Sequence, residues 1–106
     1  MEKRVVDAVQ RFVEELRRDG IEVVAVYLFG SWARGNWLVN SDVDLVVVSP
    51  SFRGVPWLRR LEMLAKIEAR LDLPFSFDVL PYTPEELKDA RSAVLRDAAR
   101  YWKHIT

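Results

Sequence analysis

The stretch FGSWARGNWLVNSDVDLVVV, residues 29–48, connects two strongly apolar runs. The first run, VVAVYLF at residues 23–29, is short and rich in β-branched and aromatic residues, so it predicts a buried strand. The second run predicts another strand over residues 42–48. Asp42 and Asp44 stand at the start of this second strand, although aspartate disfavours strands. Such a departure from strand propensity indicates a functional site.

Helices are predicted before and after these two strands. Apolar residues at helical spacing from Val5 to Leu16 predict a first helix, and Gly20 is its stop signal. Pro56 begins a second helix. Its apolar residues are expected to be Leu58, Leu61, Leu64, Ala65 and Leu71.

A third strand and a last helix complete the pattern. FSFDVL, residues 75–80, alternates between faces, so Phe77 is expected in the core and Asp78 on the opposite face. Thr83 and Glu86 form a capping box for a helix whose apolar stripe continues to Ile105. Helices alternate with strands, which predicts an α/β protein with a small mixed β-sheet flanked by α-helices. We expect one domain over residues 1–106.

The composition excludes several classes of protein. The 106 residues carry 16 basic and 16 acidic side chains, and this balance argues against a general nucleic-acid binder. Cysteine is absent, which excludes disulfides and is compatible with a reducing cytoplasm, where we expect the protein. The apolar runs are far shorter than a membrane span of about 20 residues, and the N-terminus lacks a signal-peptide pattern.

Three carboxylates are expected to converge at the sheet. Asp42 and Asp44 are two residues apart on a strand, so their side chains leave the same face. Asp78 joins them if the strands around residues 44 and 78 are neighbours. Three such anions repel one another, and a divalent cation removes the repulsion. Ligation by oxygen alone favours Mg²⁺ or Mn²⁺ over zinc.

Gly30 and Ser31 follow the first strand and predict a phosphate-binding turn. Glycine lets the backbone approach a phosphate, and backbone N–H groups together with the Ser31 hydroxyl can bind its oxygens. Arg34 is a candidate for an additional positive charge. A phosphate-binding turn that faces a carboxylate-bound metal is typical of phosphoryl or nucleotidyl transfer. In the structural alternative, Gly30–Ser31 is only a turn and Ser41–Asp42 caps a loop.

Gly30–Ser31, followed after ten residues by Asp42 and Asp44, resembles the signature of the DNA polymerase beta-type nucleotidyltransferase superfamily. The wider run GSWARGNWLVNSDVDL is most similar to the minimal nucleotidyltransferases, which occur chiefly in archaea and bacteria. Asp78 in FSFDVLPY matches the third carboxylate of that family. The resemblance extends over about residues 23–88 and implies the polymerase beta-type nucleotidyltransferase fold.

This resemblance implies a role for each motif residue. Gly30 and Ser31 would bind the triphosphate of the nucleotide, with ATP as the expected donor. Asp42 and Asp44 would hold two Mg²⁺ or Mn²⁺ ions. Asp78 would be a third ligand and would help to activate the attacking hydroxyl. The attack would fall on the α-phosphorus, and pyrophosphate would leave.

Several other residues give less specific signals. Trp32 and Trp37 flank the motif and could stack on a base, contact a partner or pack in the core. His104 is expected near the end of the last helix, at the surface and without a catalytic role. A second apolar stripe on that helix indicates deep burial or contact with another chain. It consists of Leu95, Ala99 and Trp102.

The leading functional hypothesis is an active metal-dependent nucleotidyltransferase. The chain has no room for domains that hold primer or tRNA, so we do not expect a polymerase or strong nucleic-acid binding. Minimal nucleotidyltransferases are often encoded beside a helical HEPN-type toxin, which implies an antitoxin that transfers AMP to a tyrosine of that partner. The alternative is a non-catalytic subunit that neutralises a partner by contact alone. A homo-oligomer is a further candidate assembly, and no membrane association is expected.

Overall fold

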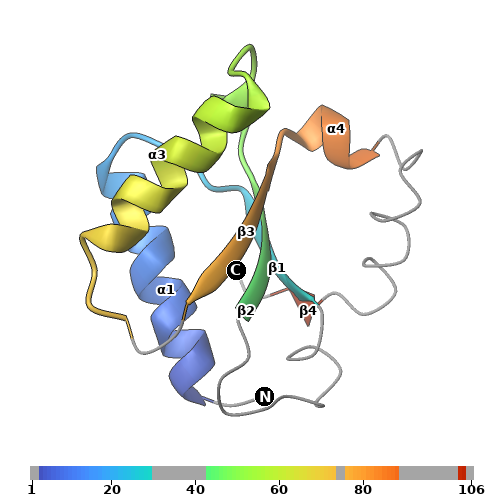
Figure 1. Ribbon diagram of the computed structural model, residues 1–106. Helices are drawn as coiled ribbons and strands as arrows, with labels where there is room; N and C mark the ends of the chain where they lie inside the picture. Colours follow the sequence, from blue (N-terminus) through green and yellow to red (C-terminus); the bar gives the residue numbers. More distant parts are fainter. Residues whose placement is uncertain (1–2, 30–42, 74–75, 89–102, 105–106) are drawn as a thin grey trace.

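The computed structural model describes residues 3–29, 43–73, 76–88 and 103–104 of the chain. These residues form helices that precede and follow the strands of a small sheet (Figure 1). The elements are α1 (Lys3–Arg18), β1 (Ala25–Phe29), β2 (Val43–Val48), the 3₁₀ turn η1 (Pro50–Phe52), α3 (Trp57–Ala69), β3 (Phe77–Tyr82), α4 (Pro84–Lys88) and β4 (Lys103–His104).

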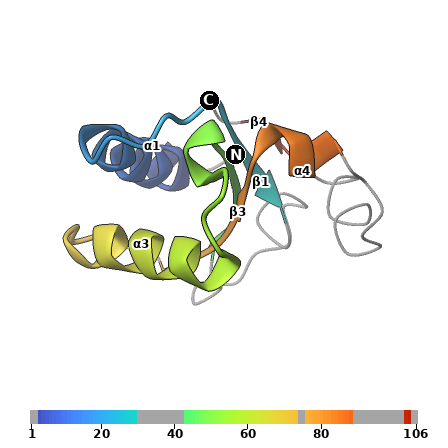
Figure 2. The same cartoon turned by 90° about the horizontal axis from the view of Figure 1, so that it is seen from above.

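The strands form one sheet in the order β3-β2-β1-β4. β1 is antiparallel to both β2 and β4, whereas β2 and β3 are parallel. Helices α1 and α3 lie side by side against one face of this sheet (Figure 2). The prediction of a small mixed sheet with flanking helices is therefore confirmed.

Helix α1 buries the apolar stripe that its sequence predicts, including Val9, Phe12 and Leu16. It ends in a Schellman motif, in which Ile21 N–H donates to Leu16 C=O at 3.0 Å. Gly20 lies in this motif with a φ of 87°, which side chains with a Cβ rarely adopt. The predicted stop signal is thus confirmed.

Alternation along β2 separates the core from the opposite face of the sheet. Val43, Leu45 and Val47 belong to the hydrophobic core that α1 and α3 cover. Phe77 of β3 packs against the same core, with its ring centroid 5.4 Å from that of Phe12. Asp44, between Val43 and Leu45, must therefore point to the other face.

Helix α3 forms where it was predicted, but its buried side chains differ from the expected set. Leu58 is 69% exposed, and Ala65 is exposed as well. The buried residues are Arg60, Leu64 and Ile67, at steps of four and three. Arg60 replaces an apolar residue in this stripe because hydrogen bonds satisfy its guanidinium group.

For the last helix, the structure confirms the predicted start but not the predicted end. Its capping box is confirmed, because Glu86 N–H donates to Thr83 Oγ1 at 3.1 Å and Thr83 N–H donates to the Glu86 carboxylate at 2.8 Å. The prediction that one helix continues to Ile105 was wrong, since Lys103 and His104 form strand β4. They pair with Leu28 and Tyr27 of β1, whose edge would otherwise be open on that side.

Candidate functional site

Two of the predicted carboxylates stand opposite each other on neighbouring strands. In the parallel pairing of β2 and β3, Asp44 is the register partner of Asp78. Residues in register on adjacent strands point to the same face of a sheet. The strands around residues 44 and 78 are neighbours, so this condition for convergence is met.

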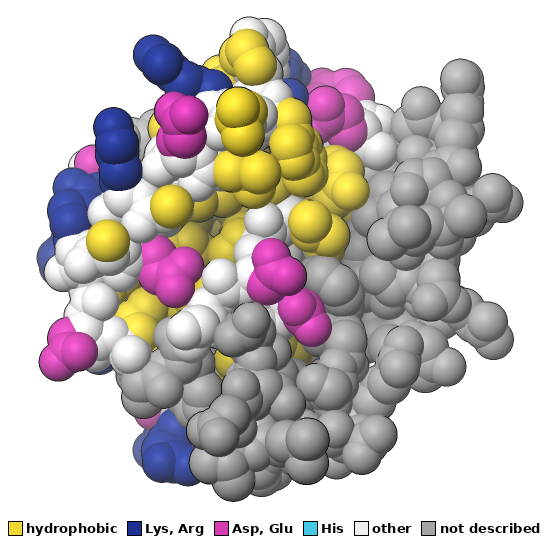
Figure 3. Space-filling model, in the orientation of Figure 1, with side chains coloured by type: hydrophobic (Ala, Val, Ile, Leu, Met, Phe, Trp, Pro, Cys, Tyr) yellow, Lys and Arg dark blue, Asp and Glu magenta, His cyan; other side chains and the backbone are white. Residues whose placement is uncertain are grey.

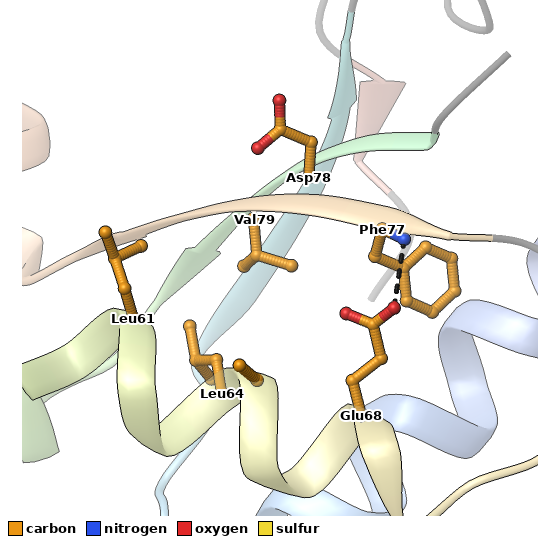
Figure 4. Close-up of a pocket in the computed structure, with 7 residues that line it drawn as sticks. Leu61, Leu64, Glu68, Phe77, Asp78 and Val79 are labelled. Carbon is orange, nitrogen blue, oxygen red and sulfur yellow. Dashed lines mark hydrogen bonds between the residues drawn. The ribbon is translucent and has the colours of Figure 1, made fainter.

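The carboxylate pair lies on the face of the sheet that is turned away from α1 and α3. Asp78 points away from α3, whereas its neighbour Val79 points toward it (Figure 4). Asp78 is exposed and Asp44 is half-buried. Further along the same face of β2, Val46 and Val48 are buried. The polar site is therefore confined to the start of the two strands.

The end of β1 meets the starts of β2 and β3 at this place. Phe29, the last residue of β1, is the register partner of Asp44. Gly30 follows Phe29 in the chain, and Asp42 precedes β2. Gly30, Ser31, Arg34 and Asp42 lie outside the described residues, as do Trp32, Trp37 and the stripe of Leu95, Ala99 and Trp102. Their predicted roles stay predictions.

The carboxylate pair has the donor chemistry of a site for a hard divalent cation. Mg²⁺ in proteins is commonly held by one or two carboxylates, with water and phosphate oxygens as its other ligands. Two carboxylates directly opposite each other repel, and a cation between them offsets that repulsion. Within the described residues, no group of three acidic or histidine side chains is placed to hold a metal. Asp44 and Asp78 therefore fit as two of the three carboxylates of the predicted metal site.

A hollow of about 150 Å³ lies on the other side of β3, between this strand and α3 (Figure 4). Most of its lining residues have apolar side chains, and it lies toward the helices whereas the Asp78 carboxylate points away. The hollow and the carboxylate pair are therefore separate features. The residues that line the hollow are Leu61, Leu64, Ala65, Glu68, Phe77, Asp78 and Val79.

Arg60 of α3 holds the C-terminal end of β3. It is 6% exposed, and its guanidinium donates to Pro81 C=O at 3.1 Å and to Val55 C=O at 2.8 Å. Both of its terminal nitrogens also donate to the Glu86 carboxylate, at 2.7 and 3.2 Å. These hydrogen bonds hold the pKa of Glu86 below its ordinary value. A buried cation is stable here because each side of it is paired.

Glu68, two turns further along α3, contacts the N-terminal end of the same strand. Its carboxylate accepts a hydrogen bond of 3.2 Å from Phe77 N–H (Figure 4). Neither Arg60 nor Glu68 was predicted from the sequence to have a role at the site. The available signal was their spacing, because residues 60, 64 and 68 recur every four positions along one side of the helix.

Hydrophobic side chains are exposed near the start of α3 (Figure 3). Trp57 is 40% exposed and Leu58 is 69% exposed. The centroid of the Trp57 ring lies 5.4 Å from that of the Tyr82 ring at the end of β3.

None of the described helices has the length and hydrophobicity that a membrane span requires.

Residues 9–101 match the nucleotidyltransferase domain family, so the chain belongs to that family. No match was found among curated proteins. A Sulfolobus solfataricus protein described as a candidate nucleotidyltransferase has a similar structure, with a TM-score of 0.64 and 24% identity over 83% of this chain and 75% of that one.

Two further similar structures come from toxin–antitoxin systems. A chain of a toxin–antitoxin structure with AMP-PNP has a TM-score of 0.60 and 28% identity, covering 91% of this chain and 71% of that one. A chain of a variant of the toxin–antitoxin MntA–HpeT has a TM-score of 0.59 and 22% identity, covering 92% of this chain and 70% of that one. The similarity to the Sulfolobus solfataricus protein and the similarity to the MntA–HpeT variant concern the fold alone.

Proposed function

We propose that this protein transfers AMP from ATP to a hydroxyl of a protein partner, as the antitoxin of a HEPN-type toxin. The observation that carries the proposal is the register pairing of Asp44 with Asp78 at the end of β1, in a member of the nucleotidyltransferase domain family. The similarity to a chain of a toxin–antitoxin structure with AMP-PNP supports both the nucleotide and the class of partner.

In this proposal each residue has one task. Gly30 and Ser31 bind the triphosphate, with Arg34 as an additional positive charge. Asp42, Asp44 and Asp78 hold Mg²⁺ or Mn²⁺. When bound, the metal neutralises phosphate charge and stabilises the charge that develops on the leaving group.

The transfer itself breaks a phosphoanhydride bond of the nucleotide and forms a phosphoester bond to the acceptor. The acceptor hydroxyl oxygen forms a bond to the α-phosphorus, and the bond between the α-phosphorus and the bridging oxygen of pyrophosphate breaks. Asp78 accepts the hydroxyl proton and releases it to solvent, which its exposed position permits. Most of the rate comes from holding the hydroxyl in line with the leaving oxygen.

A protein acceptor agrees with the surface of the described residues. Trp57 and Leu58 expose apolar side chains near the end of β3, and aromatic residues are enriched at interface centres. The acceptor that we expect is a tyrosine hydroxyl of the HEPN-type toxin. A second copy of this chain is a further candidate partner.

The deciding experiment follows ATP labelled on its α-phosphate, incubated with this protein and Mg²⁺, with or without a candidate HEPN-type partner protein. We expect label on a tyrosine of the partner, located by mass spectrometry. Asp78→Asn should lower the rate at least about 100-fold, because it removes a metal ligand and the proton acceptor. Asp72→Asn, which changes an exposed aspartate beyond α3, is the matched control and should leave the rate unchanged.

An unlabelled partner that the Asp78→Asn variant still neutralises would contradict the transfer. That result would instead support neutralisation by contact alone. Label that appears on nucleic acid and not on protein would contradict the choice of acceptor while leaving the class of reaction in place.

A further inference from the structure

Among the strands that the structure describes, β3 lies at one edge of the sheet, and only alternate residues of it bond to β2. Val43 N–H donates to Ser76 C=O at 2.9 Å, which fixes the alternation. The backbone groups of Phe77, Val79 and Pro81 must then face the open edge, because hydrogen-bonding directions alternate along a parallel strand. Pro81 has no N–H to offer there.

Helix α3 contacts this open edge at both of its ends. Arg60 donates to Pro81 C=O, and Glu68 accepts from Phe77 N–H. The two side chains thus occupy edge groups that could otherwise pair with another strand. The two contacts differ in position, because Phe77 directly precedes Asp78 whereas Pro81 lies three residues beyond it.

The start of β3 needs such a contact for a physical reason. Asp78 must stay in register with Asp44 if both carboxylates are to face the same cation. No tight turn fixes the register of β2 and β3, since a parallel pair is joined by a crossover, which here contains α3. A slip of one residue would turn Asp78 into the core and Phe77 out of it.

We infer that Glu68 is a positioning residue for Asp78, acting through the hydrogen bond from Phe77 N–H. The role rests on the proposed function, since it concerns the geometry of the proposed metal site. Glu68 and Asp78 lie on opposite sides of β3, so Glu68 reaches Asp78 only through the backbone (Figure 4). Glu68 holds the start of the strand in the register that keeps Asp78 opposite Asp44.

Two substitutions separate the hydrogen bond from the charge. Glu68→Gln keeps an acceptor at the same reach and removes the charge. Glu68→Asp keeps the charge and withdraws the carboxylate from Phe77 N–H by one methylene. The control is Glu62→Asp, because Glu62 is exposed on the same helix.

The measurement is the affinity for Mn²⁺ in the presence of a non-hydrolysable ATP analogue, by calorimetry, together with hydrogen exchange at the Phe77 amide. We expect Glu68→Asp to bind Mn²⁺ about tenfold more weakly, which is the smaller effect typical of residues that orient a metal ligand without touching the metal. We also expect hydrogen exchange at the Phe77 amide to be faster in this variant. Glu68→Gln and Glu62→Asp should match the unaltered protein in both measurements.

Each other outcome contradicts the role of Glu68. Undiminished binding by Glu68→Asp would show that the hydrogen bond does not position Asp78, while leaving the proposed metal site intact. Weaker binding by Glu68→Gln together with undiminished binding by Glu68→Asp would assign the effect to charge. Equal losses in the two variants would show that a hydrogen-bond acceptor at this position is not sufficient. Absence of Mn²⁺ binding by the unaltered protein would overturn the proposed function, and the role of Glu68 with it.

Discussion

At its C-terminal end, strand β3 is fixed by the buried Arg60, whereas its N-terminal end is held by the half-buried Glu68 and carries Asp78. Arg60 bonds to two backbone carbonyls and to the Glu86 carboxylate, and its guanidinium lies 5.8 Å from the centroid of the Phe52 ring. Glu68 accepts one hydrogen bond from the strand, beside a pair of like charges.

The contrast separates stability from chemistry along a single strand. A buried, fully paired cation contributes strongly to holding the fold, because removing it leaves several partners unsatisfied. A pair of opposed carboxylates costs stability and offers a site for a cation. The strand is therefore anchored most firmly at the end away from the candidate site, and substitutions at the two ends should have opposite effects on stability.

The largest effect is expected for Arg60→Ala. The change leaves Pro81 C=O and Val55 C=O without their donor and removes the partner of Glu86. We expect a loss of about 3 kcal/mol in the free energy of unfolding, measured by urea denaturation. Arg59→Ala, at the exposed neighbouring position, should change it by less than about 0.5 kcal/mol. Equal effects of the two variants would contradict the anchoring role.

A smaller effect is expected in the pH dependence of stability. The pKa of Glu86 lies below its ordinary value of 4.5 in the folded protein, first because of the hydrogen bonds from Arg60. This stabilising contribution is present above the ordinary value and is lost as the pH falls through the lowered pKa. The melting temperature of the unaltered protein should thus fall in acid more steeply than that of Glu86→Gln.

The matched variant for this titration is Glu85→Gln on the same short helix. Arg53 lowers the pKa of Glu85 through a hydrogen bond, but both side chains are 59% exposed, so solvent weakens their interaction. We expect Glu85→Gln to change the acid profile less than Glu86→Gln does. The reverse order would show that burial of Arg60 does not strengthen its ion pair.

The smallest effect, and the one of opposite sign, is expected for Asp78→Asn in the absence of metal. Removing one of two opposed charges should raise the free energy of unfolding by about 0.5 kcal/mol. Thermal unfolding with and without Mg²⁺ measures this, since the cation should stabilise the unaltered protein and have little effect on the variant. A destabilised variant without metal would mean that the two carboxylates do not repel each other in the fold.

Much of this architecture could be predicted from local pattern. The apolar stripe of α1, the runs that form β1 and β2, and the capping box at Thr83 are each encoded within a few neighbouring residues. The end of the chain could not be predicted in this way. Apolar residues at helical spacing continue to Ile105, yet His104 pairs with Tyr27, because the edge of β1 provides hydrogen bonds that no local pattern records.

For the candidate site, the sequence by itself determined the residue types. It placed Asp42 and Asp44 two residues apart, which predicts one face for both side chains on a strand, and it put Asp78 on the face opposite Phe77, because side chains alternate with a period of two. Tertiary structure alone decided that Asp78 stands opposite Asp44, and that Arg60 and Glu68 of α3 contact the two ends of the strand. Strand order and register depend on packing between segments distant in the chain, which the spacing within one segment cannot specify.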